Sequence, residues 1–116
     1  MSELEEMKVG ETEMWGMANL TPNETGLPMV VWVSEKGGAK HGPRIKVSTE
    51  LGAKIDPGST VTVTIEDNPR KIGSARLAAK HLTQVAEFIR KNSKVLIQYW
   101  ERKISTKDMM DKIEKL

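Results

Sequence analysis

The residues best suited to bind an anion lie within the segment 40–47, where a Gly-Pro turn precedes cationic residues separated by aliphatic ones. The cations at positions of the same parity are Lys40, Arg44 and Lys46. Because side chains alternate across a β-strand, a continuous strand would place these cations on one face and aliphatic side chains on the other. We therefore predict an anion-binding sheet face. The predicted binding residues are Lys40, His41, Arg44, Lys46, Arg70 and Lys71.

Two histidines suggest a second chemistry, since imidazole titrates near neutral pH and can exchange protons during catalysis. With Arg44 nearby, His41 and His81 would supply the proton transfers and the cation that RNA cleavage needs. His81, however, lies between Ala78 and Leu82 at the boundary of an apolar helical stripe, where a packed histidine is the usual finding. No complete catalytic motif is present, so we predict no catalytic residues and keep an RNA-directed enzyme as an alternative.

The formal charge is unevenly distributed along the chain. Residues 1–27 contain six Glu and one Lys, a charge of −5, whereas the whole chain carries +2, so residues 28–116 carry +7. A basic body favours nucleic acid or an acidic protein as a partner. The same distribution is also compatible with a basic face that only keeps the protein soluble, and with an acidic segment that folds back over the basic one.

Several classes of site have no support in the sequence. Cysteine is absent, which excludes disulfides, thiolate zinc sites and cysteine nucleophiles. Gly37 and Gly38 lack the following Lys, Ser and helix of a phosphate-binding loop, and we expect them to form a hairpin turn. We expect no cofactor and no metal. No apolar run approaches the roughly 20 residues of a membrane span and the Glu-rich start is unlike a signal peptide, so we expect a cytoplasmic protein without membrane contact.

Strand patterns begin after residue 27 and predict an antiparallel sheet. The apolar run 29–33 is typical of a central strand, and residues 43–51 form the next strand. Residues 60–66 alternate apolar and polar side chains, which indicates one buried and one exposed face, and a short edge segment follows at 70–73. We predict an α+β fold, in which an antiparallel meander of three or four strands has one face covered by C-terminal helices.

The apolar period changes from 2 to 3.6 residues after Gly73. Ser74 is a candidate N-cap for a helix that begins at residue 75, and Asn92 is expected to help end this helix and begin a second one. Ser105 fits the start of a capping box in front of a terminal amphipathic helix. The C-terminal half is therefore predicted to be helical.

Residues 1–27 show no sustained period, and we expect an acidic, partly flexible arm in front of a single domain, residues 28–116. The arm is not wholly polar. The residues expected to dock as a short strand or a helical turn are Met14, Trp15, Met17 and Leu20. Trp32 and Trp100 are assigned to the core rather than to base stacking.

Several stretches together carry a family resemblance: residues 40–47 with the strand pair after them, the helix after Ser74, and a C-terminal pattern of Asn92, Trp100 and a Lys-Ile-Glu ending. They resemble a small bacterial family, a domain of unknown function numbered forty-one sixty, whose members look like a short β-meander followed by helices. The resemblance covers residues 28–116. It implies the fold, and it implies one component of an arrangement similar to a toxin-antitoxin pair, without an established activity.

This chain departs from the family at the strand. The family's usual strand carries histidines around its prolines, whereas the matching positions here are Lys40, Arg44 and Lys46. Lys and Arg are protonated near pH 7 and do not bind divalent cations as imidazole does, so the anion site is kept and the metal site is not expected. We predict an interaction module that binds an acidic protein or nucleic acid through this face. The alternatives are an RNA-directed toxin and a structural homo-oligomer.

Overall fold

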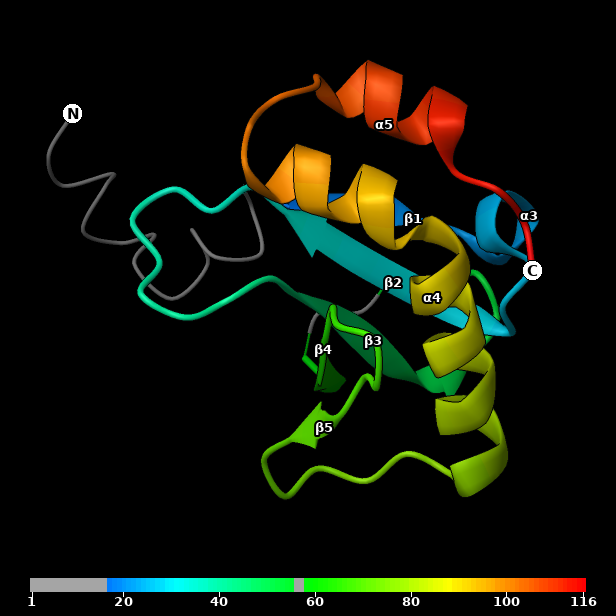
Figure 1. Cartoon of the computed structure of the whole chain (residues 1–116). Helices are drawn as coiled ribbons and strands as arrows, with labels where there is room; N and C mark the ends of the chain where they lie inside the picture. Colours follow the sequence, from blue (N-terminus) through cyan, green and yellow to red (C-terminus); the bar gives the residue numbers. More distant parts are fainter. Residues whose placement is uncertain (1–16, 56–57) are drawn as a thin grey trace, which may run out of the picture.

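The computed structural model describes residues 17–55 and 58–116, which form a five-stranded antiparallel sheet with helices on one face (Figure 1). The strands lie in chain order across the sheet: β1 (Met17–Leu20), β2 (Met29–Ser34), β3 (Arg44–Leu51), β4 (Thr60–Thr64) and β5 (Lys71–Ile72). The helices are α3 (Pro22–Thr25), between β1 and β2, and α4 (Ala79–Trp100) and α5 (Thr106–Lys112), after the sheet. The predicted α+β fold, with an antiparallel meander and C-terminal helices, is confirmed.

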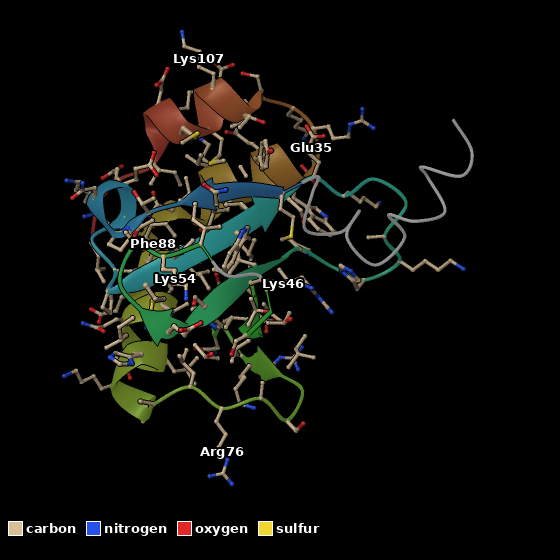
Figure 2. The ribbon with its side chains drawn as sticks, turned by 180° about the vertical axis from the view of Figure 1, so that it is seen from behind. Glu35, Lys46, Lys54, Arg76, Phe88 and Lys107 are labelled. Carbon is tan, nitrogen blue, oxygen red and sulfur yellow. The ribbon has the colours of Figure 1, made fainter. Side chains whose placement is uncertain are left out.

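Strand register decides which side chains share a face of the sheet. Ile45 of β3 pairs with Val33 of β2 and Val63 of β4, and this row of aliphatic side chains belongs to the core beneath α4. The next residue, Lys46, pairs with Trp32, so both lie on the opposite face. Figure 2 views the molecule from behind, with the sheet in front of α4. The alternation predicted for β3 and β4 is therefore present.

The core fills the space between the sheet and α4. The buried residues that α4 contributes recur at helical spacing and are Val85, Phe88, Ile89, Leu96 and Tyr99. Residues 29–33 of β2 are each no more than 2% exposed, as expected for a strand with neighbours on both sides. Trp32 and Trp100 are 2% and 4% exposed, so both tryptophans are buried as predicted.

β1 adds a fifth strand from residues that the sequence pattern assigns to the arm. Met17–Leu20 pairs with residues 31–34 of β2, and Leu20 is buried in the core. The docking expected for this part of the chain is confirmed. Met14 and Trp15, and the flexibility expected of the acidic arm before β1, lie outside the described residues.

The two helices predicted on either side of Asn92 are a single helix, α4, which runs from Ala79 to Trp100. The Asn92 side chain is buried, and its Nδ2 donates to the carbonyls of Phe88, at 3.1 Å, and Glu114, at 3.0 Å. Its Oδ1 accepts from the Glu114 N–H at 2.8 Å. The bond to Phe88 joins two residues one turn apart within α4, and the two bonds to Glu114 satisfy the rest of the amide, so the side chain caps no helix end. The prediction that Asn92 ends the helix was wrong for this reason.

The first turn of α4 also differs from the prediction, whereas α5 agrees with it. Ala78, not Ser74, is the N-cap of α4, and residues 75–78 have no regular secondary structure. Figure 1 shows this connection running from β5 to the helix. An extended chain advances about 3.3 Å per residue, whereas a helix advances about 1.5 Å. Residues 75–78 therefore span more of the path from β5 to α4 in an extended conformation than they would as a helical turn. In α5, the Ser105 hydroxyl accepts from the Asp108 N–H at 3.1 Å, as predicted.

The last residues of the chain return to the first helix of the fold. The Leu116 N–H donates to the Thr25 carbonyl at 2.8 Å, and Lys91 Nζ donates to the Lys115 carbonyl at 2.6 Å. We refer to the contacts of residues 114–116 with Thr25, Lys91 and Asn92 as the C-terminal clamp. The clamp joins α3, α4 and the tail although these segments are far apart in the sequence.

Candidate anion-binding site

The loop between β2 and β3, residues 35–43, packs against the end of α4. The Lys36 N–H donates to the Trp100 carbonyl at 2.8 Å. The rings of His41 and Trp100 lie with centroids 5.5 Å apart and planes tilted by 36°. A buried tryptophan thus supports the loop from below while His41 stays exposed. The loop and the helix end therefore form one continuous surface.

This surface, which we name the basic loop surface, carries more positive than negative charge. Its cations are Lys36, Lys40, Arg44, Arg102 and Lys103. Two glutamates partly neutralise them: Arg102 Nε lies 3.9 Å from Glu35, and Lys103 Nζ lies 3.1 Å from Glu101. All four side chains are at least 41% exposed, and ion pairs so open to water are weak. The other three cations form no ion pair among the described residues.

Lys40 does not share the strand face of Arg44 and Lys46. β3 begins at Arg44, and Lys40 is exposed in the preceding loop. On one side of β3, its neighbour β2 ends at Ser34. On the other side, the residue after β4 still bonds to the segment before β3, since the Ile65 N–H donates to the Pro43 carbonyl at 3.0 Å. Residues before Pro43 consequently have no strand to pair with. The condition for a face shared by all three cations, a strand continuous from Lys40, is therefore not met, whereas Arg44 and Lys46 share the face away from α4.

A small pocket lies where the start of β3 meets the turn between β4 and β5. It encloses about 140 Å³. Its lining residues are Gly42, Pro43, Arg44, Thr64, Ile65, Glu66 and Arg70. Arg44 and Arg70 are both predicted binding residues, and they come from adjoining parts of the sheet although 26 positions separate them. The fold thus brings two arginines to one concave site.

Glu66 supplies an internal anion to this pocket. Its Oε2 accepts from the Thr64 hydroxyl at 2.6 Å and lies 2.8 Å from Arg70 Nε. These contacts, the hydrogen bond from Thr64 first and that from Arg70 second, hold the pKa of the Glu66 carboxyl below its ordinary value of 4.5. The Thr64 hydroxyl also accepts from the Arg70 N–H at 2.9 Å, which fixes the turn. One oxyanion is therefore already held at this edge of the sheet.

Arg44 differs from Arg70 in its surroundings. Its side chain is half-buried, and its Nε is buried without a hydrogen-bond partner. A buried donor without an acceptor is unfavourable by about 1 to 3 kcal/mol. An arginine fork that accepts a planar or tetrahedral oxyanion uses this atom together with a terminal nitrogen. Arg44 therefore has a buried donor that no group in the described part of the chain uses.

The remaining predicted residues are not all brought to the site. Lys71 pairs with Val63, so it lies on the α4 side of the sheet, and its Nζ donates to the Gly73 carbonyl at 2.6 Å. His81 lies near the start of α4, whereas His41 contacts Trp100 at its end. Nineteen residues of helix separate positions 81 and 100, about 28 Å along the axis. The structure does not bring the two histidines together for acid-base catalysis.

Sequence patterns missed several residues of the site. Lys36, Arg102 and Lys103 join the basic loop surface only because the loop packs on the helix end. Arg102 has a left-handed backbone, with φ of 62°, which no feature of the sequence indicates. The sequence did contain a signal for Glu66, because its carboxylate lies four residues before Arg70, the residue with which it forms an ion pair.

Two classes of site find no support in the part of the chain that the structure describes. No group of three His, Asp or Glu side chains there is arranged to hold a metal ion. In the same residues, none of the helices combines the length and apolar character that crossing a membrane requires.

Comparison with known proteins identifies no relative. The chain matches no protein-family model, and neither a curated protein nor a solved structure shows significant similarity to it. The family resemblance described from the sequence stays a prediction, and the surface itself is the basis on which a function can be proposed.

Proposed function

We propose that this protein is a non-enzymatic interaction module that binds nucleic acid through the basic loop surface and the adjoining Arg44 and Lys46 face of β3. The observation that carries the proposal is the packing of residues 35–43 against Trp100, which gathers cations from two distant parts of the sequence. Cations that contact phosphates release condensed counterions, and this term supplies most of the affinity of sequence-independent binding.

The basic loop surface has no apolar anchor among the described residues, which supports nucleic acid over an acidic protein as the partner. Protein interfaces usually depend on a few large side chains that enter pockets of the partner. Within the described residues, the exposed large apolar side chains are Leu51, Ile55, Met110 and Leu116. None belongs to the basic loop surface, and the first lies seven residues from Arg44 along β3, about 23 Å away. An acidic protein partner is the alternative that the experiment tests.

The aromatic residues support contact with the phosphate backbone rather than with bases. Single-stranded nucleic acid is commonly held by stacking on exposed aromatic rings. Among the described residues, every Phe, Tyr and Trp is buried, and none is more than 4% exposed. Binding through phosphates alone predicts weak preference for sequence and strong dependence on salt.

Two finer predictions from the sequence form part of this proposal. The first is a cytoplasmic location. The second is a role as one component of a toxin-antitoxin-like pair, which depends on the family resemblance alone. A structural homo-oligomer is the competing hypothesis that invokes no nucleic acid, and it predicts a molar mass that rises with protein concentration.

The proposal is tested by fluorescence anisotropy with labelled 20-nucleotide single-stranded RNA, single-stranded DNA and duplex DNA at several salt concentrations. The test variant replaces Lys36, Lys40 and Lys103 by Gln. The matched control replaces three exposed lysines outside the surface, Lys80, Lys94 and Lys107, by Gln. For duplex DNA, loss of three phosphate contacts makes the negative slope of log affinity against log salt shallower by roughly 3. We expect this loss in the test variant and not in the control.

Two arms of the experiment address the alternatives. Poly-glutamate of equal charge replaces nucleic acid in the first, and tighter binding of poly-glutamate would favour an acidic protein partner. The second incubates labelled RNA with the protein for a prolonged time and scores shorter products, with His41→Ala as the control for catalysis. RNA cleavage that this substitution abolishes would replace the proposed module by the RNA-directed toxin. Equal affinity of both lysine variants would contradict the proposed surface.

A further inference from the structure

The pocket between Arg44 and Arg70 has features that a flat basic surface lacks. It is concave, and two arginines, Arg44 and Arg70, line it together with Thr64. Gly42 forms part of its rim, and a Cβ built there would meet no atom within 4 Å, so the rim is open at this point. A group that carries several acceptor oxygens would find donors from more than one side chain.

Glu66 shows that an oxyanion is stable at this position. The carboxylate accepts from both Thr64 and Arg70, and its lowered pKa follows from these donors. The side chains of the ion pair are nevertheless 41% and 68% exposed, so the pair is weak and exchangeable. An incoming oxyanion would therefore compete with a carboxylate that the chain itself provides.

Arg44 gives the incoming group an advantage over Glu66. Its buried Nε has no hydrogen-bond partner, and Glu66 makes no hydrogen bond to it. Since Nε is covered, the guanidinium must rotate toward the pocket before a ligand reaches it. A phosphate with oxygens on more than one side can bond to Arg44 and Arg70 at once, and arginine forks match phosphate geometry well.

We infer that this pocket binds a single phosphate group between Arg44 and Arg70, and that the phosphate displaces Glu66 from Arg70. The inference deepens the proposed function and rests on it in one respect, since it assumes that the phosphate belongs to a bound nucleic acid. A free phosphate monoester has the same chemistry, so the experiment separates the two sources. The pocket would fix the register of the polyanion, while the basic loop surface supplies charge.

The experiment follows backbone amide resonances by ¹H–¹⁵N NMR during titration with inorganic phosphate at constant ionic strength. We expect saturable shifts at Gly42, Arg44, Glu66 and Arg70. Arg44→Lys keeps the charge but loses the fork, and we expect it to abolish saturation. Lys94→Gln removes a lysine outside the site and should leave the shifts unchanged. Glu66→Gln removes the competitor and should tighten phosphate binding about threefold, as expected for loss of an exposed ion pair.

The same titration with a 5′-phosphorylated oligonucleotide, an unphosphorylated oligonucleotide and a nucleoside monophosphate identifies the source. Saturation by either oligonucleotide well below the nucleoside monophosphate concentration assigns the pocket to nucleic acid, and the reverse order assigns it to a small phosphate. Shifts that do not saturate, or that persist in Arg44→Lys, would overturn the inference. If salt-sensitive binding of nucleic acid remains in that case, the proposed function stands without the pocket.

Discussion

The C-terminal clamp and the phosphate pocket use polar side chains in opposite ways. In the clamp, the buried Asn92 amide forms three hydrogen bonds, two of them to the backbone of Glu114. In the pocket, Arg44 leaves a buried donor without a partner, and Arg70 depends on an exposed glutamate. The Asn92 amide of the clamp is satisfied within the chain, whereas Arg44 of the proposed binding site keeps bonding capacity for a ligand.

Two residues with a left-handed backbone at helix ends also differ between a role in the fold and a role at the proposed binding surface. Gly26 ends α3 with φ of 80°, and its lack of a side chain lets Leu116 approach. Arg102 follows α4 with φ of 62°, although glycine is the usual residue in such a motif. The Lys103 N–H bonds to the Gln98 carbonyl at 2.8 Å and the Arg102 N–H to the Tyr99 carbonyl at 3.0 Å. A strained cation at the basic loop surface is consistent with binding at the expense of stability.

The largest effect is expected for Asn92→Leu, which should lower the free energy of unfolding by about 3 kcal/mol. The substitution removes three hydrogen bonds and leaves the Glu114 N–H and carbonyl without these partners. Urea denaturation measures the change. Lys94→Leu on the exposed side of the same helix is the control and should change stability by less than about 0.5 kcal/mol. A similar loss in both variants would show that the clamp does not stabilise the fold.

Gly26→Ala should lower stability by about 2 kcal/mol, because a left-handed alanine is strained and its Cβ meets the tail. A Cβ there would lie 2.9 Å from the Leu116 carbonyl oxygen and 3.0 Å from its nitrogen. Gly73→Ala separates the two causes, since Gly73 has φ of 91° and open space around it. Thermal unfolding should show a smaller loss for Gly73→Ala. Equal losses would mean that backbone strain alone accounts for the effect.

Arg102→Gly should raise stability by roughly 0.5 to 1 kcal/mol while it weakens nucleic-acid binding. Glycine relieves the left-handed strain, which outweighs its greater freedom in the unfolded chain, and the exposed contact with Glu35 contributes little. Arg102→Ala removes the same charge but keeps the strain, so it should weaken binding without the gain. Urea denaturation and anisotropy on the same samples test both. A loss of stability in Arg102→Gly would mean that the side chain is structural.

The smallest effect concerns pH and the Glu66 carboxyl. Its pKa is lower in the folded chain than the ordinary 4.5, so the contacts with Thr64 and Arg70 stabilise the fold above that pH. The contribution is lost as the pH falls from 4.5 through the folded pKa. Urea midpoints of the wild type and Glu66→Gln should therefore differ more at about pH 6 than at about pH 3. A difference that is independent of pH would contradict the role of the charge.

The sequence determined the elements whose signals are local. The alternation in β3 and β4, the apolar run of β2 and the Ser105 N-cap of α5 each depend on neighbours a few residues away, and these elements form as predicted. A period of two or 3.6 residues records which side faces the core, because burial of apolar surface is the main driving force. The fold class follows from these periods.

Only the tertiary structure decided which distant residues meet. Asn92 looks like a helix end until the tail, 22 positions later, supplies its partners. Lys40 has the parity of Arg44 and Lys46, but it would share their face only in a continuous strand, and the loop that contains it instead packs on Trp100. Arg44 and Arg70 share a pocket because β3 and β4 pair. A sequence period carries no record of such contacts, since their free energy depends on both partners at once.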